Sequence, residues 1–392
     1  MNPNNLTKIC LLSVCFVICH AVLAFAEGEL NFKSLGLSSL GIETFFEIRQ
    51  RYEDNVFQVP MNSKPQQDLV TSVWAGLDLK IRFDERTRFS TRYEAALRRL
   101  IDLERKNRRD QLLSLLFQRK LGRKLSLLML GNLGLRSQPN DQINDYFKQN
   151  LASQVHIQWT PLWSSQFGAQ LRHKSFPNNN SDYTSVMVEG KLRRRLGVIS
   201  QIRGGYQLRA YNGAVDPRVL QSNLNKDMEG IRQSASIWFE SILFGRVLMD
   251  WKYQIEFDIA TRELQRQEHF SKEEYESGAF EEEHEDFDDD EDEADFNFLT
   301  HRVATMLVWR IFSSSTVSLY ARHDFKYYSD WLVPTTNSQR HDNLTLLRLY
   351  FKQKLFSSLS ARLAYSLEKN NSNDPTQKYT NNIYAIGLQF SF

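Results

Sequence analysis

Apolar and polar residues alternate with a period of two along most of the chain. Between Leu69 and Phe83, one set of alternate positions is apolar except for Thr71, and the other carries Ser, Asp, Lys and Arg among its members. The same pattern recurs in residues 89–98, 247–257 and 317–327. A period of two predicts strands with one apolar and one polar face. These stretches run to about 11 to 15 residues, whereas strands of globular proteins usually have about five or six.

The alternation predicts sixteen strands, and the connections between them are alternately short and long. The long connections contain turn-forming residues, as in SQPNDQIND, PNNNS and KNNSNDPTQ. The short connections are at residues 84–87, 122–124, 161–163, 193–196, 241–245, 313–315 and 356–358. The predicted strands are residues 41–53, 68–83, 88–99, 111–121, 125–136, 147–160, 164–175, 183–192, 197–211, 230–240, 246–257, 298–312, 316–328, 342–355, 359–369 and 380–392.

Long strands with one apolar and one charged face need hydrocarbon on one side and water on the other. A closed barrel meets this need, because it pairs every backbone group and leaves no free edge in the membrane. About 9–11 residues of a tilted strand cross the apolar band. Aromatic residues also recur at the predicted strand ends, as is typical of membrane barrels. We therefore predict an all-β, transmembrane, antiparallel up-and-down barrel of about 16 strands over residues 41–392.

The first 26 residues have the pattern of a cleaved export signal. Lys8 is followed by an apolar run from Ile9 to Leu23, and Ala24–Ala26 gives a small-x-small cleavage site. An uncleaved membrane anchor is the alternative interpretation. All three cysteines lie in this segment, so no disulfide is expected in the mature chain. Residues 27–40 would form a short N-terminal segment, and no later stretch is long and apolar enough for a membrane-spanning helix.

The final stretch, YAIGLQFSF, closes the alternation with an apolar row that reaches the last residue. The row consists of Tyr384, Ile386, Leu388, Phe390 and Phe392. With this ending, the chain resembles bacterial outer-membrane β-barrel proteins of porin-like architecture. The resemblance implies integral insertion in the outer membrane of a Gram-negative cell, in contact with its lipid. It also implies short periplasmic turns, long extracellular loops, and recognition of the final strand by the barrel-assembly machinery. The resemblance is one of architecture only, so it assigns no functional residue to this chain.

If the charged faces of the strands point inward, the lumen is basic. We count about twenty-five Lys and Arg against about eleven Asp and Glu on these faces, and rings of basic residues in a pore favour anions. Guanidinium groups suit carboxylate or phosphate solutes. The alternative is an internal lattice of ion pairs with Glu43, Glu47, Asp78, Glu94, Asp250 and Asp324. The candidate pore-lining residues are Arg49, Arg51, Lys80, Arg82, Arg92, Arg98, Arg136, Arg172, Arg203, Arg209, Arg232, Arg302, Arg322, Arg348, Lys352 and Arg362.

An acidic insert interrupts this basic chain within the connection at residues 258–297. Residues 273–295 contain no Lys or Arg, although the whole chain has a net charge of +2. The insert is either a solvated, self-repelling extracellular loop or a screen for the basic mouth. Asp288, Asp290 and Asp292 have the spacing of an EF-hand, but Glu293 replaces its turn glycine, so no defined metal site is expected. Its densest part comprises Glu281, Glu282, Glu283, Glu285, Asp286, Asp288, Asp289, Asp290, Glu291, Asp292, Glu293 and Asp295.

Three functions are compatible with this pattern, and an anion-preferring channel for small solutes is the one we expect. A structural or secretion-related barrel that binds a partner through its loops is the alternative. A lipid-modifying enzyme is the third, because His173 and His323 fall on the apolar faces, with Ser175 near the former. The sequence contains no Gly-x-Ser-x-Gly, HExxH or Gly-rich phosphate motif. We therefore expect no enzyme activity, no cofactor and no nucleic-acid partner.

Overall fold

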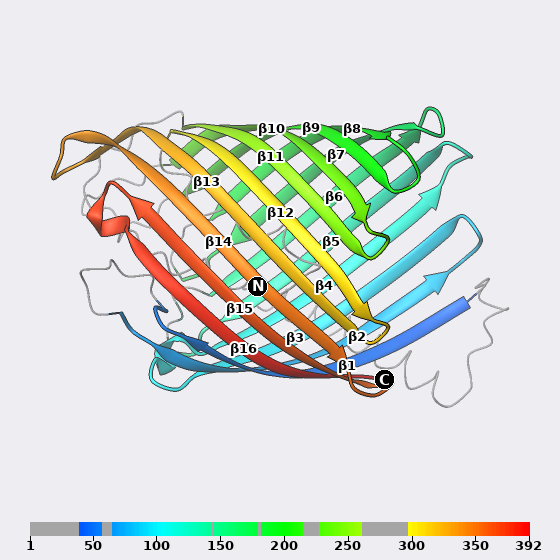
Figure 1. The fold of residues 1–392 in the computed structure, drawn as a ribbon, viewed down its shortest axis with the longest axis horizontal. Coiled ribbons are helices and arrows are strands. Elements are labelled where there is room, and N and C mark those ends of the chain that lie inside the picture. Colours follow the sequence, from blue (N-terminus) through cyan, green and yellow to red (C-terminus); the bar gives the residue numbers. More distant parts are fainter. Residues whose placement is uncertain are drawn as a thin grey trace, which may run out of the picture.

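The computed structural model describes residues 39–56, 65–140, 142, 145–178, 182–214, 227–260 and 297–392. In these residues sixteen antiparallel strands form a closed barrel, in which each strand pairs with the next and the last pairs with the first (Figure 1). The strands are β1 (Ser39–Glu53), β2 (Asp68–Arg82), β3 (Thr87–Leu100), β4 (Arg108–Lys120), β5 (Leu125–Ser137), β6 (Tyr146–Gln158), β7 (Trp163–Ser175), β8 (Tyr183–Arg195), β9 (Ser200–Ala214), β10 (Asp227–Leu243), β11 (Val247–Ala260), β12 (Phe298–Phe312), β13 (Ser315–Val333), β14 (Ser338–Lys354), β15 (Leu359–Ser372) and β16 (Tyr379–Ser391).

The structure confirms the predicted sixteen-stranded, all-antiparallel, up-and-down barrel. The limits of β12 are as predicted, and those of the other strands differ by at most three residues except in β13 and β14. Short turns and the C-terminus lie at one end of the barrel, and the longer connections lie at the other (Figure 1). The described residues contain no helix long and apolar enough to cross a membrane.

The predicted boundary between β8 and β9 is wrong. Residues 193–196 were expected to form the short turn, but β8 continues to Arg195 and the turn comprises residues 196–199. The apolar sequence LGVI resembles the start of a strand, yet Val198 is fully exposed at the rim. Apolar residues at such a rim are stable because it borders the membrane interface. The correction adds Arg193 and Arg195 to the wall of the barrel.

The connection predicted at residues 329–341 is mostly strand. β13 extends to Val333 and β14 starts at Ser338, so the two form the longest hairpin, whose tip projects beyond its neighbours (Figure 1). The turn is closed by the backbone N–H of Asn337, which donates to the carbonyl oxygen of Val333 at 2.8 Å. Asn337 has a positive φ of 50°, a conformation that asparagine tolerates.

The predicted export signal (residues 1–26) and the acidic run (residues 273–295) lie outside the described residues. β1 starts at Ser39, two residues before the predicted barrel boundary at residue 41. Residues 39–40, expected in the N-terminal segment, therefore belong to the barrel.

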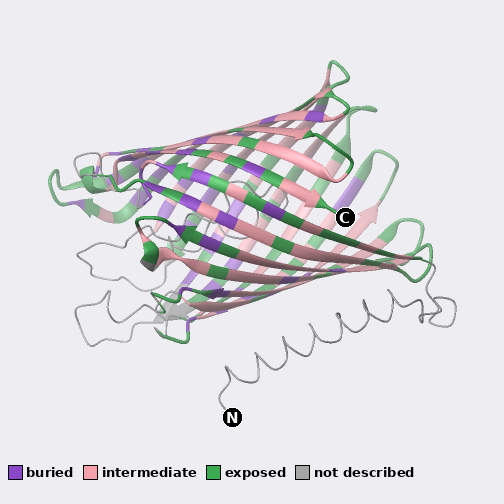
Figure 2. Ribbon diagram, turned by 90° about the horizontal axis from the view of Figure 1, so that it is seen from below, coloured by how far each residue is buried: buried purple, intermediate pink, exposed green. Residues whose placement is uncertain are grey.

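On these strands the apolar residues are exposed and the charged residues are buried, which is the reverse of a soluble protein. Large apolar residues on one face are exposed, such as Leu171 at 49%, whereas its neighbour Arg172 on the other face is 3% exposed. Buried and exposed residues accordingly alternate along the strands (Figure 2). Because residues paired across strands share a face, the register carries one charged face around the whole barrel. This face is the inner wall, and the apolar face is the exterior.

The first and last strands close the barrel with the residues of the final apolar row. Phe46 and Ile48 of β1 lie opposite Phe390 and Leu388 of β16, on the exterior. Beyond β16, the backbone of Phe392 accepts a hydrogen bond from Thr44 at 3.0 Å and donates one to it at 2.9 Å. The backbone pairing that closes the barrel therefore extends to the last residue. The Phe392 side chain is 75% exposed at the short-turn rim.

Candidate functional site

The structure places all sixteen candidate basic residues on the inner wall. For example, Arg49 is in register with Ser72, which is in register with Arg98. In the same way, Arg302 lies opposite Asp324, and Lys352 lies opposite Arg362. The register thus puts these side chains on one face of the sheet, the same face as the buried Arg172.

Many of these residues form ion pairs along the wall. Glu47 accepts hydrogen bonds from Arg49 on its own strand and from Arg362 two strands away, each at 2.8 Å. Asp324 likewise bridges Arg302 and Arg322, each at 3.0 Å. Further pairs involve Arg51, Lys80, Arg92, Arg136, Arg203 and Arg232. The internal lattice that was considered as an alternative to a basic pore is therefore present.

The other six candidates also have contacts. Arg209 donates toward the sulfur of Met187 at 4.0 Å. The remaining five, Arg82, Arg98, Arg172, Arg348 and Lys352, take part in further interactions. The inner wall is thus an organised polar surface in which basic side chains are held in place.

Carboxylates are scarce on the inner wall along one side of the barrel, so the net positive charge is greatest there. In the described parts of β5–β9, Glu189 is the one carboxylate on the inner face. We call the basic residues of this face the basic sector: Arg136, Lys148, Arg172, Lys174, Lys191, Arg193, Arg195, Arg203 and Arg209. Elsewhere on the described wall, Lys and Arg are interspersed with carboxylates from β1–β4, β10, β11 and β13–β15.

Aromatic rings lie beside the cations at the long-loop end of the basic sector. Tyr146 is 4.7 Å from the Arg136 guanidinium carbon and 4.4 Å from Lys174 Nζ, measured to the ring centroid. Lys148 lies directly opposite Lys174, so two like charges face each other there. Both lysines were missing from the sequence candidates, although each occupies one of the alternate strand positions that were predicted to face inward.

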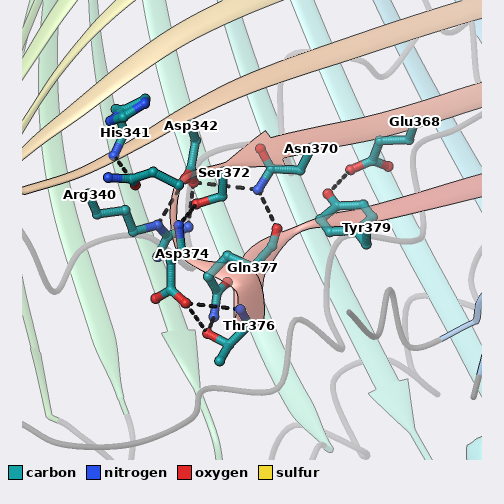
Figure 3. Close-up of polar contacts among 11 residues, drawn as sticks. Arg340, His341, Asp342, Glu368, Asn370, Ser372, Asp374, Thr376, Gln377 and Tyr379 are labelled. Carbon is teal, nitrogen blue, oxygen red and sulfur yellow. Dashed lines mark hydrogen bonds and ion pairs between the residues drawn. The ribbon is translucent and has the colours of Figure 1, made fainter. Parts of the chain in front are cut away.

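A hydrogen-bonded network fixes the long-loop end of β14–β16 (Figure 3). Arg340 donates to Asp342 at 3.0 Å, and Asn370 donates to the carbonyl oxygen of Gln377 at 2.8 Å. Tyr379, which is buried, donates to Glu368. The connection between β15 and β16 contains a 3₁₀ turn, η3 (Pro375–Gln377), capped by Asp374. The network was not predicted, because its residues come together only when the strands pair.

His173 and His323, the two exterior histidines considered for catalysis, each hydrogen bond a threonine rather than a serine. His173 Nδ1 lies 2.9 Å from the Thr184 hydroxyl, and His323 Nδ1 lies 2.9 Å from the Thr345 hydroxyl. In both cases the partner is on the adjacent strand. Ser175, which was considered beside His173, shares its face but is two residues away on the same strand.

No family model and no curated protein matches the chain. Among solved structures, OccAB1 of Acinetobacter baumannii is similar with a TM-score of 0.52 and 7% identity, over 91% of this chain and 97% of that one. OmpT of Vibrio cholerae, described as outer-membrane expressed, has a TM-score of 0.48 and 9% identity, over 91% and 98%. These similarities concern the fold. The chain is an integral outer-membrane β-barrel of porin-like architecture, with short periplasmic turns and long extracellular loops.

Proposed function

We propose that the barrel is a water-filled channel for small solutes and that it prefers anions. A sixteen-stranded barrel encloses a lumen too wide for its own side chains to fill. The observation that carries the proposal is the basic sector, in which nine Lys and Arg share the inner face of five strands with a single carboxylate. Low-dielectric walls strengthen the field of such a surface and concentrate counter-ions beside it.

The arrangement of charge also supports transport rather than stability alone. Within the basic sector the register places cations opposite each other, Lys148 against Lys174 and Arg193 against Arg203, while Arg136, Lys191 and Arg203 also pair with carboxylates. Like charges directly opposite destabilise a sheet. A function in solute binding accounts for their presence.

Recording in planar lipid bilayers tests the proposal. Purified barrel should give discrete conductance steps, and in a potassium chloride gradient the reversal potential should show that chloride permeates faster than potassium. Folded barrel that gives no steps would instead support a structural or secretion-related protein that binds a partner through its loops. Insertion is checked independently by the difference in gel mobility between unboiled and boiled samples.

We further propose that the acidic insert screens the mouth of the channel. The proposal is supported by the opposite charges of residues 273–295 and the basic sector. Attraction between them should be strongest at low ionic strength, where the Debye length is about 30 Å at 0.01 M. We assign the insert no metal ion.

The proposed function includes no catalytic group. His173 and His323 are bonded to threonines on the exterior, and such pairs also satisfy polar groups at a membrane interface. A phospholipid-hydrolysis assay tests the enzymatic alternative. Hydrolysis that is lost in both His173→Ala and His323→Ala would contradict the assignment of a channel without catalysis.

A further inference from the structure

Trp238 lies on the inner wall within a row of basic residues near the periplasmic end of the barrel. Arg193, Arg203, Trp238 and Lys252 lie directly opposite one another on the successive strands β8, β9, β10 and β11. The centroid of the indole ring is 5.8 Å from the Arg203 guanidinium carbon and 5.3 Å from Lys252 Nζ. The ring thus touches the row of cations on both sides.

Gly205 makes room for this indole on the adjacent strand. A Cβ atom at Gly205 would lie 2.8 Å from Cζ3 of Trp238, closer than carbon atoms approach in proteins. The ring therefore packs against bare backbone of β9, and its position on the wall is fixed. Lys191, which is in register with Gly205, has its Nζ atom 6.0 Å from the centroid of the same ring.

Arg193 and Arg203 bring two positive charges together beside the indole. In-register residues have Cβ atoms about 4.5–5.5 Å apart, and like charges at this position repel. Arg203 is close to Glu240 at 3.4 Å and to Asp250 at 3.6 Å, so its charge is partly balanced. Arg193 donates to the neutral hydroxyl of Ser164 at 3.0 Å, which leaves its charge unbalanced by that contact.

Two further cations lie on the same face of β8. Lys191 precedes Arg193 by two residues and Arg195 follows it by two, so all three side chains point into the lumen. Lys191 is paired with Glu189 at 2.8 Å, whereas Arg195 is exposed. The group therefore has an excess of positive charge directly on the path of a solute.

We propose that Arg193, Arg195 and Arg203 form a binding station for the phosphate group of a permeating solute. A phosphate dianion carries two charges and three acceptor oxygens, so it can accept hydrogen bonds from two guanidinium groups at once. It offsets the repulsion between Arg193 and Arg203, whereas chloride provides one charge and no fixed geometry. The inference rests on the proposed channel, because the solute reaches the station through the lumen.

The test is a titration of tryptophan emission with inorganic phosphate, at pH 8 and low salt, on the purified full-length barrel in detergent micelles. Wild-type protein should show a saturable change that disappears in Trp238→Phe. Arg193→Gln should raise the half-saturating concentration about tenfold, and Arg193→Lys, which keeps the charge but loses the guanidinium geometry, about threefold. Lys352→Gln is the matched control, because Lys352 also lies two residues from the periplasmic end of its strand. It should change the concentration less than about twofold.

Three results would overturn the station: no saturable change in the wild type, equal shifts for Arg193→Gln and Lys352→Gln, or a full signal in Trp238→Phe. Succinate that binds as tightly as phosphate would overturn the assignment to phosphate. Because Arg193→Lys retains the charge, it decides the question if Arg193→Gln fails to fold. The titration involves no ion flow, so it is independent of the bilayer experiment. A barrel that conducts anions but does not respond to phosphate refutes the station alone.

Discussion

Arg362 on β15 donates a hydrogen bond of 2.8 Å to Glu47 on β1 and so bridges β16, the strand that closes the barrel. Glu47 also accepts from Arg49, and its side chain is 6% exposed. Neutralising this carboxylate removes the ion-pair partner of Arg49 and Arg362, whose side chains are only 12% and 17% exposed. We expect Glu47→Gln to lower the free energy of unfolding by about 3 kcal/mol.

The control for this prediction is Glu43→Gln, on the same face of the same strand. Glu43 also pairs with a cation, Lys80 at 2.8 Å, but its side chain is 65% exposed. Exposed pairs contribute at most about 1 kcal/mol. Urea unfolding of both variants in vesicles gives the comparison, and equal losses would show that Glu47 has no special part in closure.

A second prediction concerns the direction of side chains in β7. Leu171 faces lipid and Gln170 faces the lumen, although they are adjacent in the chain. Arginine on the lipid face of a barrel costs about 2–4 kcal/mol at the bilayer midplane. We therefore expect Leu171→Arg to reduce stability and insertion strongly, while Gln170→Arg inserts as the wild type does. Heat-dependent gel mobility of membrane fractions measures insertion. If Gln170→Arg inserted less well than Leu171→Arg, the assignment of the inner and outer faces would be wrong.

A third prediction concerns a buried network near the extracellular end of β9–β11. The Tyr211 hydroxyl donates to Asp258 at 2.7 Å, and Asp258 also pairs with Arg232 at 2.7 Å. Tyr211→Phe removes one hydrogen bond and should cost about 1–2 kcal/mol. Asp258→Ala leaves Arg232 buried and should cost about 3–5 kcal/mol. If urea midpoints show the tyrosine variant to be the less stable, the carboxylate is not the centre of this network.

A fourth prediction follows from the screening proposed for the acidic insert. Deletion of residues 273–295 should raise single-channel conductance at low salt and have little effect at 1 M salt, where the Debye length is about 3 Å. A second variant, in which a Gly/Ser linker of equal length replaces these residues, separates the effect of charge from that of loop length. Unchanged conductance at low salt would contradict the screen.

The sequence predicted the fold because the membrane environment imposes a local rule on each strand. Leu171 and Arg172 could be assigned to opposite faces without knowledge of any other strand, since period-two alternation fixes the direction of side chains. The sixteen basic candidates point inward for the same reason. The closed order of strands then follows from short connections between neighbours in the chain.

The sequence did not predict the features that depend on pairing between strands. The opposition of Arg193 and Arg203 requires the register of β8 with β9, and the predicted turn at residues 193–196 had removed Arg193 from the wall. The hydrogen bond of His173 to Thr184 likewise depends on register.

The reversal potential in a salt gradient tests the central claim most directly. For the wild-type barrel between unequal potassium chloride solutions, we predict the sign that corresponds to faster permeation of chloride. Lys148→Gln/Lys174→Gln, which removes facing charges from the basic sector, should reduce this preference more than the control Lys352→Gln/Lys354→Gln on β14. A potential of the opposite sign in the wild type, showing faster permeation of potassium, would contradict the claim.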